Sequence, residues 1–578
     1  MNPIDCDVAI IGGGPGGATT GALIRKYRPD LEVAIFERER FPRDHVGESQ
    51  LPPIGVILEE MGCWDKVEAA NFPIKIGATY RWGRSDKLWD FEFMPLDDYR
   101  EQQRPRRYDH QARQLAFQVD RAVYDRILLE HAASLGCQVF QDTQVRSVGR
   151  DGDCVTGLVL DDGRAVQARH YVDASGASAL LRRAMDVAVD VPTKLQNVAF
   201  WDYWENAEWA SRFPGGATRV LVMSIGTGWI WFIPLGPTRT SIGFVCPAGF
   251  YKQQERSAAE LYDWALAQEP MIAELTARAT RENNVRATRD WSFLSARMAG
   301  ENWLLVGEAG GFADPILAAG LTLTHTSARE AAYTILALEQ PDGLDPAWLR
   351  SHYERNQSTR IRQHIRFADF WYSANGIFTD LQEYTREIAR DAGLEFSPQR
   401  AFQWLGTGGF ANDTLGQAGI GGLDLAGARQ VALRMVDGPQ AWQVSRFNAF
   451  RLNLRNAKVE MIPAYEDGRV VEVRCHVRGN RRLAEYGFYK VLIDNLRQER
   501  DISRLLERIR GGSLPAAGTQ TLDLTAHHLL QALEVMVNDG WVEAKHDRKR
   551  PNLTLATPFE GKRIHTNVEL NRSAAGGA

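Results

Sequence analysis

The sequence predicts an α/β fold with a Rossmann-like domain, an inserted β-rich domain, and a helical, winged-helix-like C-terminal region. Three observations support this prediction. An apolar strand runs into Gly12-x-Gly14-x-x-Gly17 and then into a helix. Short strand-like runs fill residues 188–284, and a helix–helix–turn–strand pattern occupies about 465–560. Strands that alternate with helices in the first part are typical of a parallel sheet covered by helices.

The glycine loop occurs in the full context of a dinucleotide-binding unit. Glycine is required where the chain turns tightly, where the backbone approaches a pyrophosphate, and where the helix packs on the strand. The N–H groups at the start of the following helix favour phosphate. A second buried-type strand ends at Glu37, twenty residues after Gly17, where a carboxylate can accept from ribose hydroxyls. We therefore expect a bound dinucleotide at this loop.

The order of the elements predicts four parts. Residues 1–187 and 285–340 form a discontinuous nucleotide-binding domain, because a parallel-type strand and a long helix follow the β-rich insertion. Residues 188–284 form a β-rich substrate domain, 341–464 a helical region, and 465–578 a winged-helix-like module.

Composition narrows the function classes. The chain has 578 residues, 44% hydrophobic and 24% charged, which is ordinary for a globular protein with a large core. The net charge of −5 argues against general nucleic-acid affinity. The basic cluster Lys545–Arg550 could contact phosphates, but a lid or a dimer support is the simpler role for the C-terminal module.

The same composition bears on the cell compartment. No apolar run has membrane-spanning length, the first strand leaves no room for a signal peptide, and the six cysteines lack metal-type spacing. We expect a cytoplasmic protein with reduced thiols, no metal, no membrane span and no nucleic-acid partner. The oligomeric state stays open.

Two later motifs add to the glycine loop: Asp173-Ala-Ser-Gly176, and the run from Gly307-Glu308 to Asp314-Pro315. Together the three resemble the FAD-binding set of the p-hydroxybenzoate-hydroxylase-type flavoproteins, with Glu308 where that family has aspartate. The family also has a Gly-Glu-Ser turn and a Val-Asp-Arg helix start near the flavin, and both recur here. The resemblance implies an FAD cofactor, held by Gly12, Gly14, Gly17, Glu37, Glu48, Ser49, Arg121, Asp173, Gly176, Glu308 and Asp314.

A narrower resemblance rests on two further segments. Gly228–Pro234 reproduces the W-x-W-x-I-P motif of flavin-dependent halogenases, and Phe72–Gly77 looks like the segment that carries their essential lysine. The resemblance covers about residues 1–440. It implies catalytic roles for Lys75, Trp229 and Trp231, and a site for chloride or bromide at Ala319 and Gly320.

For the reaction, the resemblance implies FADH2- and O2-dependent halogenation in secondary metabolism, such as antibiotic biosynthesis. A separate flavin reductase supplies FADH2, and hypohalous acid passes along a tunnel to Lys75. There a hydrogen bond or an N-haloamine directs it at an electron-rich ring. The sequence has no second nucleotide motif for NAD(P)H, which fits a two-component system in which the reductase is a separate protein. Two other reactions on this fold stay open: an FAD-dependent monooxygenase (hydroxylase) and an FAD-dependent reductase.

Two departures from the halogenase pattern bear on the substrate and the halide. Leu317 replaces the glutamate that tryptophan-acting members carry after the late proline. A phenolic or pyrrolic compound, free or bound to a carrier protein, is therefore favoured over free tryptophan. Ala318 and Ala319 replace hydroxyl residues beside the halide site, which keeps the backbone amides but removes side-chain donors.

The alternation of residues also allows a plainer interpretation of the lysine. Lys75, Gly77 and Thr79 alternate with apolar residues, which predicts a strand with a wet face and a solvated lysine. Trp229 and Trp231 share one face of a strand, where core packing is the simpler role. The halogenase resemblance favours a functional role for all three side chains.

Overall fold

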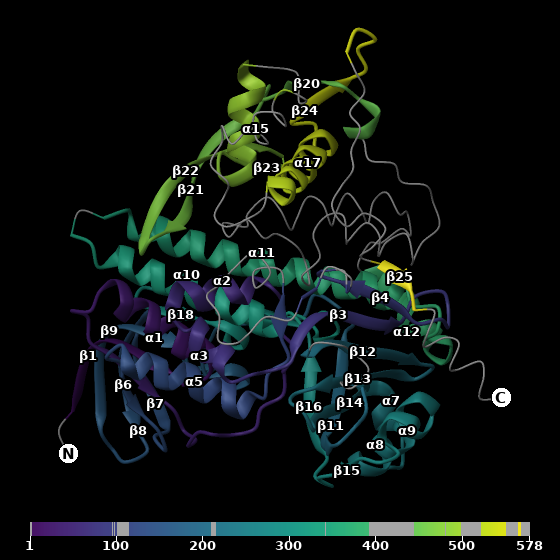
Figure 1. Cartoon of the computed structure of the whole chain (residues 1–578). Helices are drawn as coiled ribbons and strands as arrows, with labels where there is room; N and C mark the ends of the chain where they lie inside the picture. The colour runs from purple at the N-terminus through teal and green to yellow at the C-terminus, as the bar shows by residue number, and fades with distance from the viewer. Residues whose placement is uncertain are drawn as a thin grey trace.

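In a computed structural model of the chain, the described residues are 3–94, 96, 99–100, 115–209, 216–341, 343–391, 444–479, 481–498, 504, 522–550 and 564–567. Two large sheets organise this part, and a separate C-terminal module lies above two long helices (Figure 1).

The first sheet holds the glycine loop at the carboxyl end of its central strand. The sheet order is β6-β2-β1-β9-β8-β7, with β18 paired to the end of β9, and β1, β2, β9 and β18 run parallel. The late strand therefore returns to the sheet with which the chain begins. In chain order the strands are β1 (Ile4–Ile11), β2 (Val33–Phe36), β6 (Gln138–Phe140), β7 (Val145–Asp151), β8 (Cys154–Leu160), β9 (Ala165–Asp173) and β18 (Trp303–Leu305).

The second sheet has the order β15-β11-β14-β13-β12-β3-β4-β25, with β16 on β11 and β5 on β3. Strands β3, β4 and β5 come from residues 74–117, so this sheet takes strands from outside the expected range 188–284. Its strands are β3 (Ile74–Arg81), β4 (Trp89–Glu92), β5 (Ala116–Phe117), β11 (Gln196–Glu205), β12 (Ala217–Ile225), β13 (Gly228–Pro234), β14 (Arg239–Pro247), β15 (Thr280–Arg281), β16 (Arg286–Trp291) and β25 (Ile564–Thr566). A smaller sheet contains β10 (Val189–Asp190), β17 (Phe293–Ser295) and β19 (Gly311–Phe312).

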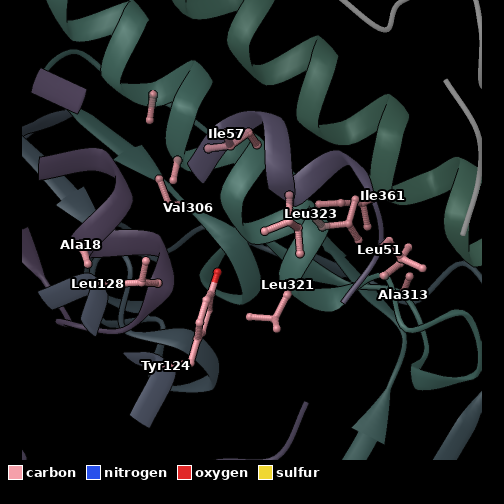
Figure 2. Close-up of a cluster of buried hydrophobic side chains, with 14 of the residues drawn as sticks. Ala18, Leu51, Ile57, Tyr124, Leu128, Val306, Ala313, Leu321, Leu323 and Ile361 are labelled. Atoms are coloured by element: carbon pink, nitrogen blue, oxygen red, sulfur yellow. The ribbon is translucent and has the colours of Figure 1, made fainter. Parts of the chain in front are cut away.

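The helices of the N-terminal part cover these sheets. Figure 2 shows side chains from several of them, among which are Ala18 of α1, Leu128 of α5, Leu323 of α10 and Ile361 of α11, within one buried apolar cluster. The helices are α1 (Pro15–Tyr27), α2 (Pro53–Met61), α3 (Trp64–Ala69), α5 (Arg121–Ser134), α6 (Leu180–Ala184), α7 (Ala248–Gln253), α8 (Ala258–Ala267), α9 (Pro270–Thr276), α10 (Gly320–Leu338), α11 (Pro346–Ser373) and α12 (Gln382–Asp391).

The C-terminal module has its own apolar core and begins earlier than expected. Strands occupy 449–452 and 458–466, of which the first lies within the predicted helical region 341–464 and the second crosses its end, because each pairs with a later strand. Helices α11 and α12 lie within the same predicted region, and its residues 392–443 lie outside the described residues. The module contains β20 (Ala449–Leu452), β21 (Lys458–Glu466), β22 (Arg469–Arg478), β23 (Arg481–Ala484), α15 (Gly487–Gln498), α17 (Leu522–Asn538) and β24 (Val542–Lys545).

The turn between β21 and β22 docks on α10 (Figure 1). Arg329 Nη2 donates to the carbonyl of Tyr465 at 2.9 Å, and Gly468 N donates to the hydroxyl of Tyr333 at 3.1 Å. Further toward the C-terminus, β25 adds to strand β4 of the second sheet. The C-terminal part of the chain thus contacts both α10 and the second sheet.

Among the described residues, no helix is both long and apolar enough to cross a membrane. The same residues contain no group of three or more His, Cys, Asp or Glu side chains arranged to hold a metal ion.

Candidate functional site

One cavity of about 590 Å³ extends from the glycine loop to Lys75, and we call it the central cavity. Residues from the first sheet, from the second sheet and from the start of α10 line it. Of the expected site residues, those that line it are Gly12, Gly14, Glu37, Glu48, Ser49, Lys75, Arg121, Gly176, Trp229, Trp231, Glu308 and Gly320. Gly17, Asp173, Asp314 and Ala319 are not among its lining residues.

The glycine loop is shaped by close backbone contacts. Gly12 has φ of +100°, and a Cβ there would lie 2.4 Å from the carbonyl oxygen of Ala174. A Cβ at Gly17 would lie 1.9 Å from the carbonyl oxygen of Gly12, so Gly17 serves helix packing. A Cβ at Gly14 would meet only Arg43, at 3.5 Å. Gly14 therefore leaves open space on the cavity side of the loop.

The N-terminus of α1 faces that space without a side-chain cap, because its N-cap residue is Gly14. Glu37 braces the loop from the neighbouring strand: its carboxylate accepts from Gly13 N at 2.7 Å and from Glu39 N at 3.0 Å. Unpaired helix N–H groups favour a phosphate. The remaining lone pairs of Glu37 are available to hydroxyl groups of a nucleotide.

The segment 46–49 is held over the cavity by Arg121. This guanidinium pairs with Asp125 at 2.7 Å and donates to the carbonyls of Val46 and Gly47 at 3.0 and 3.2 Å. Glu48, at the end of the segment, accepts from the hydroxyl of Tyr203 at 3.1 Å. Burial raises the pKa of Glu48 to about 7. Arg121 thus positions the segment as well as charging this wall of the cavity.

The motifs at 173–176 and 307–315 contain three acidic residues. One of them lines the cavity, and the other two support loops. Glu308 lines the cavity next to Gly176, whose Cβ position lies 3.8 Å from Glu308 Oε2. Asp173 lies behind the wall and accepts from Leu181 N at 2.8 Å. Asp314 accepts from Ile316 N at 2.9 Å, and burial raises the pKa of its carboxyl. Both buried aspartates fix the loops that carry lining residues.

A β-bulge in β3 decides where the lysine points. Strands β3 and β12 run parallel with Thr218 opposite Lys75, but the next residue, Arg219, is opposite Gly77. Ile76 is therefore an extra residue, and a bulge re-aims the side chains on one side of it. A Cβ at Gly77 would lie 2.0 Å from the backbone oxygen of Phe91, so the strand needs glycine there.

Because of the bulge, Lys75 shares a face with Ala78 and Tyr80 rather than alternating with them. Val220 and Val222 of β12 lie on the same face, and all five side chains line the central cavity. The expectation of a wet strand face is wrong, since Lys75 is only 2% exposed. The simple alternation of the sequence could not show the phase change at Ile76.

The amine of Lys75 is held in an apolar setting. Its Nζ donates to the carbonyl of Gln50 at 2.9 Å and lies 5.4 Å from the centre of the Phe93 ring. Burial lowers the pKa of Lys75 to about 7. A neutral amine, which is a nucleophile, is therefore well populated near neutral pH.

The two tryptophans of β13 form another wall. Trp231 lies over Gly243, where a Cβ would be 2.1 Å from its ring, and its indole N–H donates to Ser241 at 3.1 Å. Trp229 donates to the hydroxyl of Tyr372 at 2.7 Å. Both indole N–H groups are thus paired, and the rings present their apolar surfaces to the cavity.

The residues expected to bind halide lie at the start of α10. Ala318 adopts φ of +51°, and its turn leads into the helix at Gly320. No side chain caps the helix, so its first amides are not occupied by a side-chain acceptor. Leu317, Ala318 and Gly320 line the cavity, whereas Ala319 is 1% exposed and lies behind them. The arrangement suits an anion at a helix N-terminus.

Sequence reasoning missed much of the apolar wall and its polar support. The cavity is lined by Tyr80 of β3, Phe91 of β4, Phe93 just after β4, and Trp201 of β11. Strand alternation could have proposed them only with the sheet order known, because their pairing partners are distant in the chain. Tyr372 was also missed, since α11 carries it and no local motif marks it.

Comparisons with known proteins find similarity to halogenases. The profile of the tryptophan halogenase family matches residues 7–108 and 97–377. A 1H-pyrrole-2-carbonyl-(peptidyl-carrier protein) chlorinase of Pseudomonas fluorescens is 30% identical over 390 residues, which are 66% of this chain and 86% of that protein. A tryptophan 2-halogenase of Chondromyces crocatus is 30% identical over 378 residues, covering 64% and 68%.

Solved structures extend the likeness. The flavin-dependent halogenase CmlS superposes with a TM-score of 0.70 at 23% identity, covering 96% of this chain and 98% of that one, which shows the shared fold. The myxobacterial chondrochloren halogenase CndH gives a TM-score of 0.59 at 26% identity, covering 76% and 99%.

Proposed function

The chain belongs to the tryptophan halogenase family and is a flavin-dependent halogenase, and on that premise we propose that it halogenates a phenolic or pyrrolic ring through Lys75. The observation that carries the proposal is the position of Lys75: its amine shares one cavity with the glycine loop and with the start of α10. An oxidised halide formed near the start of α10 reaches the amine through this cavity without leaving the protein.

The residues present fit FAD, the cofactor of this family. Gly14 leaves room where a pyrophosphate lies, α1 offers its N-terminal amides, and Glu37 offers acceptors for ribose hydroxyls. We assign the isoalloxazine end to the wall formed by Glu48, Arg121 and Glu308. Reduced FAD, when bound, supplies the electrons with which O2 and halide give hypohalous acid. A separate flavin reductase is the proposed source of FADH2.

The amine of Lys75 has a defined part in the transfer. In its neutral form it attacks the halogen of hypohalous acid. The N–X bond forms as the O–X bond breaks, and the departing hydroxide takes the nitrogen proton to leave as water. The lowered pKa of Lys75 favours this form near neutral pH. Alternatively, the protonated amine directs hypohalous acid by a hydrogen bond, and the pH dependence of transfer separates the two.

The cavity wall favours an aromatic substrate. Tyr80, Trp201, Trp229 and Phe91 offer flat apolar surfaces, and Leu317 offers no carboxylate to an indole N–H. A phenol needs less help, because its ionisable hydroxyl supplies electron density to the ring. The Pseudomonas relative acts on a pyrrole held by a carrier protein, which supports testing carrier-bound rings here too.

The test is a comparison of wild type with Lys75→Met. With FAD, a flavin reductase and halide, both should consume O2, and only wild type should give halogenated product. The exposed Lys252→Met serves as control. Full product from Lys75→Met would remove the lysine from the mechanism, and hydroxylated product from wild type would favour a monooxygenase.

A further inference from the structure

Three buried polar atoms near Lys75 have no hydrogen-bond partner within the described part of the chain. They are the hydroxyl oxygen of Ser49 and both amide atoms, Nε2 and Oε1, of Gln118. Ser49 is 7% exposed and Gln118 is fully buried. A buried polar group without a partner costs about 1–3 kcal/mol. Such groups gathered at one place indicate a molecule that completes their hydrogen bonds.

Ser49 and Gln118 lie directly opposite each other in an antiparallel bridge. The flanking backbone bonds, such as that from Gln50 N to the carbonyl of Phe117 at 3.0 Å, mark the pair itself as non-hydrogen-bonded. In such a pair the two side chains lie close together on one face. Their polar ends nevertheless make no hydrogen bond to each other.

Lys75 lies on the same face. It pairs with Ala116 of β5, two residues before Gln118, and alternate residues of a strand share a face. Diagonal neighbours on such a face are within reach of long side chains. The bond from Lys75 Nζ to the carbonyl of Gln50 keeps the amine beside Ser49. Ser49 and Lys75 line the central cavity, whereas Gln118 is fully buried and is not among its lining residues.

We propose that Ser49, Gln118 and Lys75 form a subsite that holds hypohalous acid before its halogen is transferred. The inference rests on the proposed function and adds two residues to it. Neutral HO–X has one O–H donor and an oxygen that accepts. Gln118 offers an acceptor and a donor side by side, and Ser49 offers a hydroxyl that does either. The halogen end is left toward Lys75.

Other occupants match the three atoms less well. A halide ion only accepts hydrogen bonds and leaves Oε1 of Gln118 without a donor. A flavin ring or an organic substrate is too large for the fully buried amide, which is not part of the cavity lining. A water molecule matches the donors and acceptors, and it is distinguished from HO–X by experiment.

The subsite is tested in a single turnover without organic substrate. Holoenzyme carrying reduced FAD is mixed with O2 and bromide and desalted, and the oxidising equivalents left on the protein are titrated with iodide. Wild type should retain them as the Lys75 N-bromoamine. Gln118→Met and Ser49→Ala should retain several-fold less and release correspondingly more hypobromous acid to monochlorodimedone in solution. If the variants retain as many oxidising equivalents as wild type, the polar atoms of Ser49 and Gln118 hold only water.

A second measurement excludes a merely structural role. In flavin-free protein, Gln118→Met should unfold at the wild-type temperature or above it, because it removes an unpaired amide. A melting temperature several degrees lower would overturn the subsite. The matched control is Ser295→Ala, because Ser295 is 1% exposed, its hydroxyl has no hydrogen-bond partner among the described residues, and it does not line the cavity. This variant should retain as many oxidising equivalents as wild type.

The outcomes also separate the subsite from the function on which it rests. If wild type forms hypobromous acid and both variants retain as many oxidising equivalents as wild type, only the subsite proposal is wrong. Wild type that consumes O2 without retaining or releasing any hypobromous acid would remove the proposed halogenation and the subsite with it.

Discussion

The indole N–H of Trp229 donates a hydrogen bond of 2.7 Å to the hydroxyl of Tyr372, across 143 residues of sequence. Tyr372 in turn donates to the carboxylate of Asp314 at 3.2 Å. Asp314 also accepts from Ile316 N, in the turn that leads to the start of α10. One buried chain of hydrogen bonds thus joins the tryptophan wall to the proposed halide site.

Removing the middle of this chain should weaken both ends. Tyr372→Phe leaves the Trp229 indole without its acceptor, and a buried group in that state costs about 1–3 kcal/mol. We expect urea unfolding to show a loss of that size, together with a lower ratio of halogenated product to O2 consumed. Tyr251→Phe, which keeps the ring contact with Phe200, is the control. An unchanged product ratio would confine Tyr372 to stability.

The buried amine should leave a signature in the pH dependence of stability. The pKa of Lys75 is about 7 in the folded protein and 10.5 in the reference state. Between these values the unfolded chain binds more protons, so stability should rise with pH. Lys75→Met lacks this effect. The free energy of unfolding of Lys75→Met should exceed that of wild type most strongly below pH 7, by on the order of several kcal/mol at about 1.4 kcal/mol per pKa unit. This difference should shrink toward pH 10.5.

Urea unfolding of wild type and Lys75→Met at neutral and at alkaline pH measures this difference. The exposed Lys252→Met should show no such trend. If the difference in free energy of unfolding between Lys75→Met and wild type does not change with pH, the amine is solvated in the folded protein.

The glycine loop can be probed with a single methyl group. Gly14→Ala should fold, because the nearest atom to the new Cβ is 3.5 Å away. The methyl group lies where the pyrophosphate needs the backbone, so FAD affinity should fall about tenfold or more, a cost of at least about 1.4 kcal/mol. Gly249→Ala, whose Cβ meets nothing within 4 Å, is the control. If a flavin titration of Gly14→Ala gives the wild-type affinity for FAD, the assignment of the pyrophosphate to the glycine loop is wrong.

Free tryptophan should be a poor substrate. Leu317 lines the cavity at the position where the resemblance to tryptophan-acting halogenases implies a carboxylate, and leucine cannot stabilise the positive charge that develops on an indole ring. Competition between tryptophan and a phenol, followed by mass spectrometry, should give mainly the halogenated phenol. Preferential halogenation of tryptophan would mean that another acid has taken that role.

Local motifs predicted the parts of the site that local chemistry dictates. The Gly12–Gly17 loop, Trp229 and Trp231 could be assigned because their spacing sets their geometry. The phase change at Ile76 could not, since it arises from the register between β3 and the distant strand β12, in which Ala217 lies opposite Ile74. Gln118 and Tyr372 were missed for the same reason: each acts through pairing or packing with distant residues.

The strands at 449–466 show the same limit on a larger scale. Each pairs with a later strand of the C-terminal module, which no local pattern in that segment predicts.

The most direct test is product mass spectrometry with the purified protein. The assay contains FAD, a flavin reductase, NADH, O2, chloride or bromide, and a panel of phenols and pyrroles, both free and carrier-bound. The account predicts a product with the isotope pattern of one added chlorine or bromine, dependent on halide and absent with Lys75→Met. A product that gains only oxygen, or one that forms equally without halide, would contradict it.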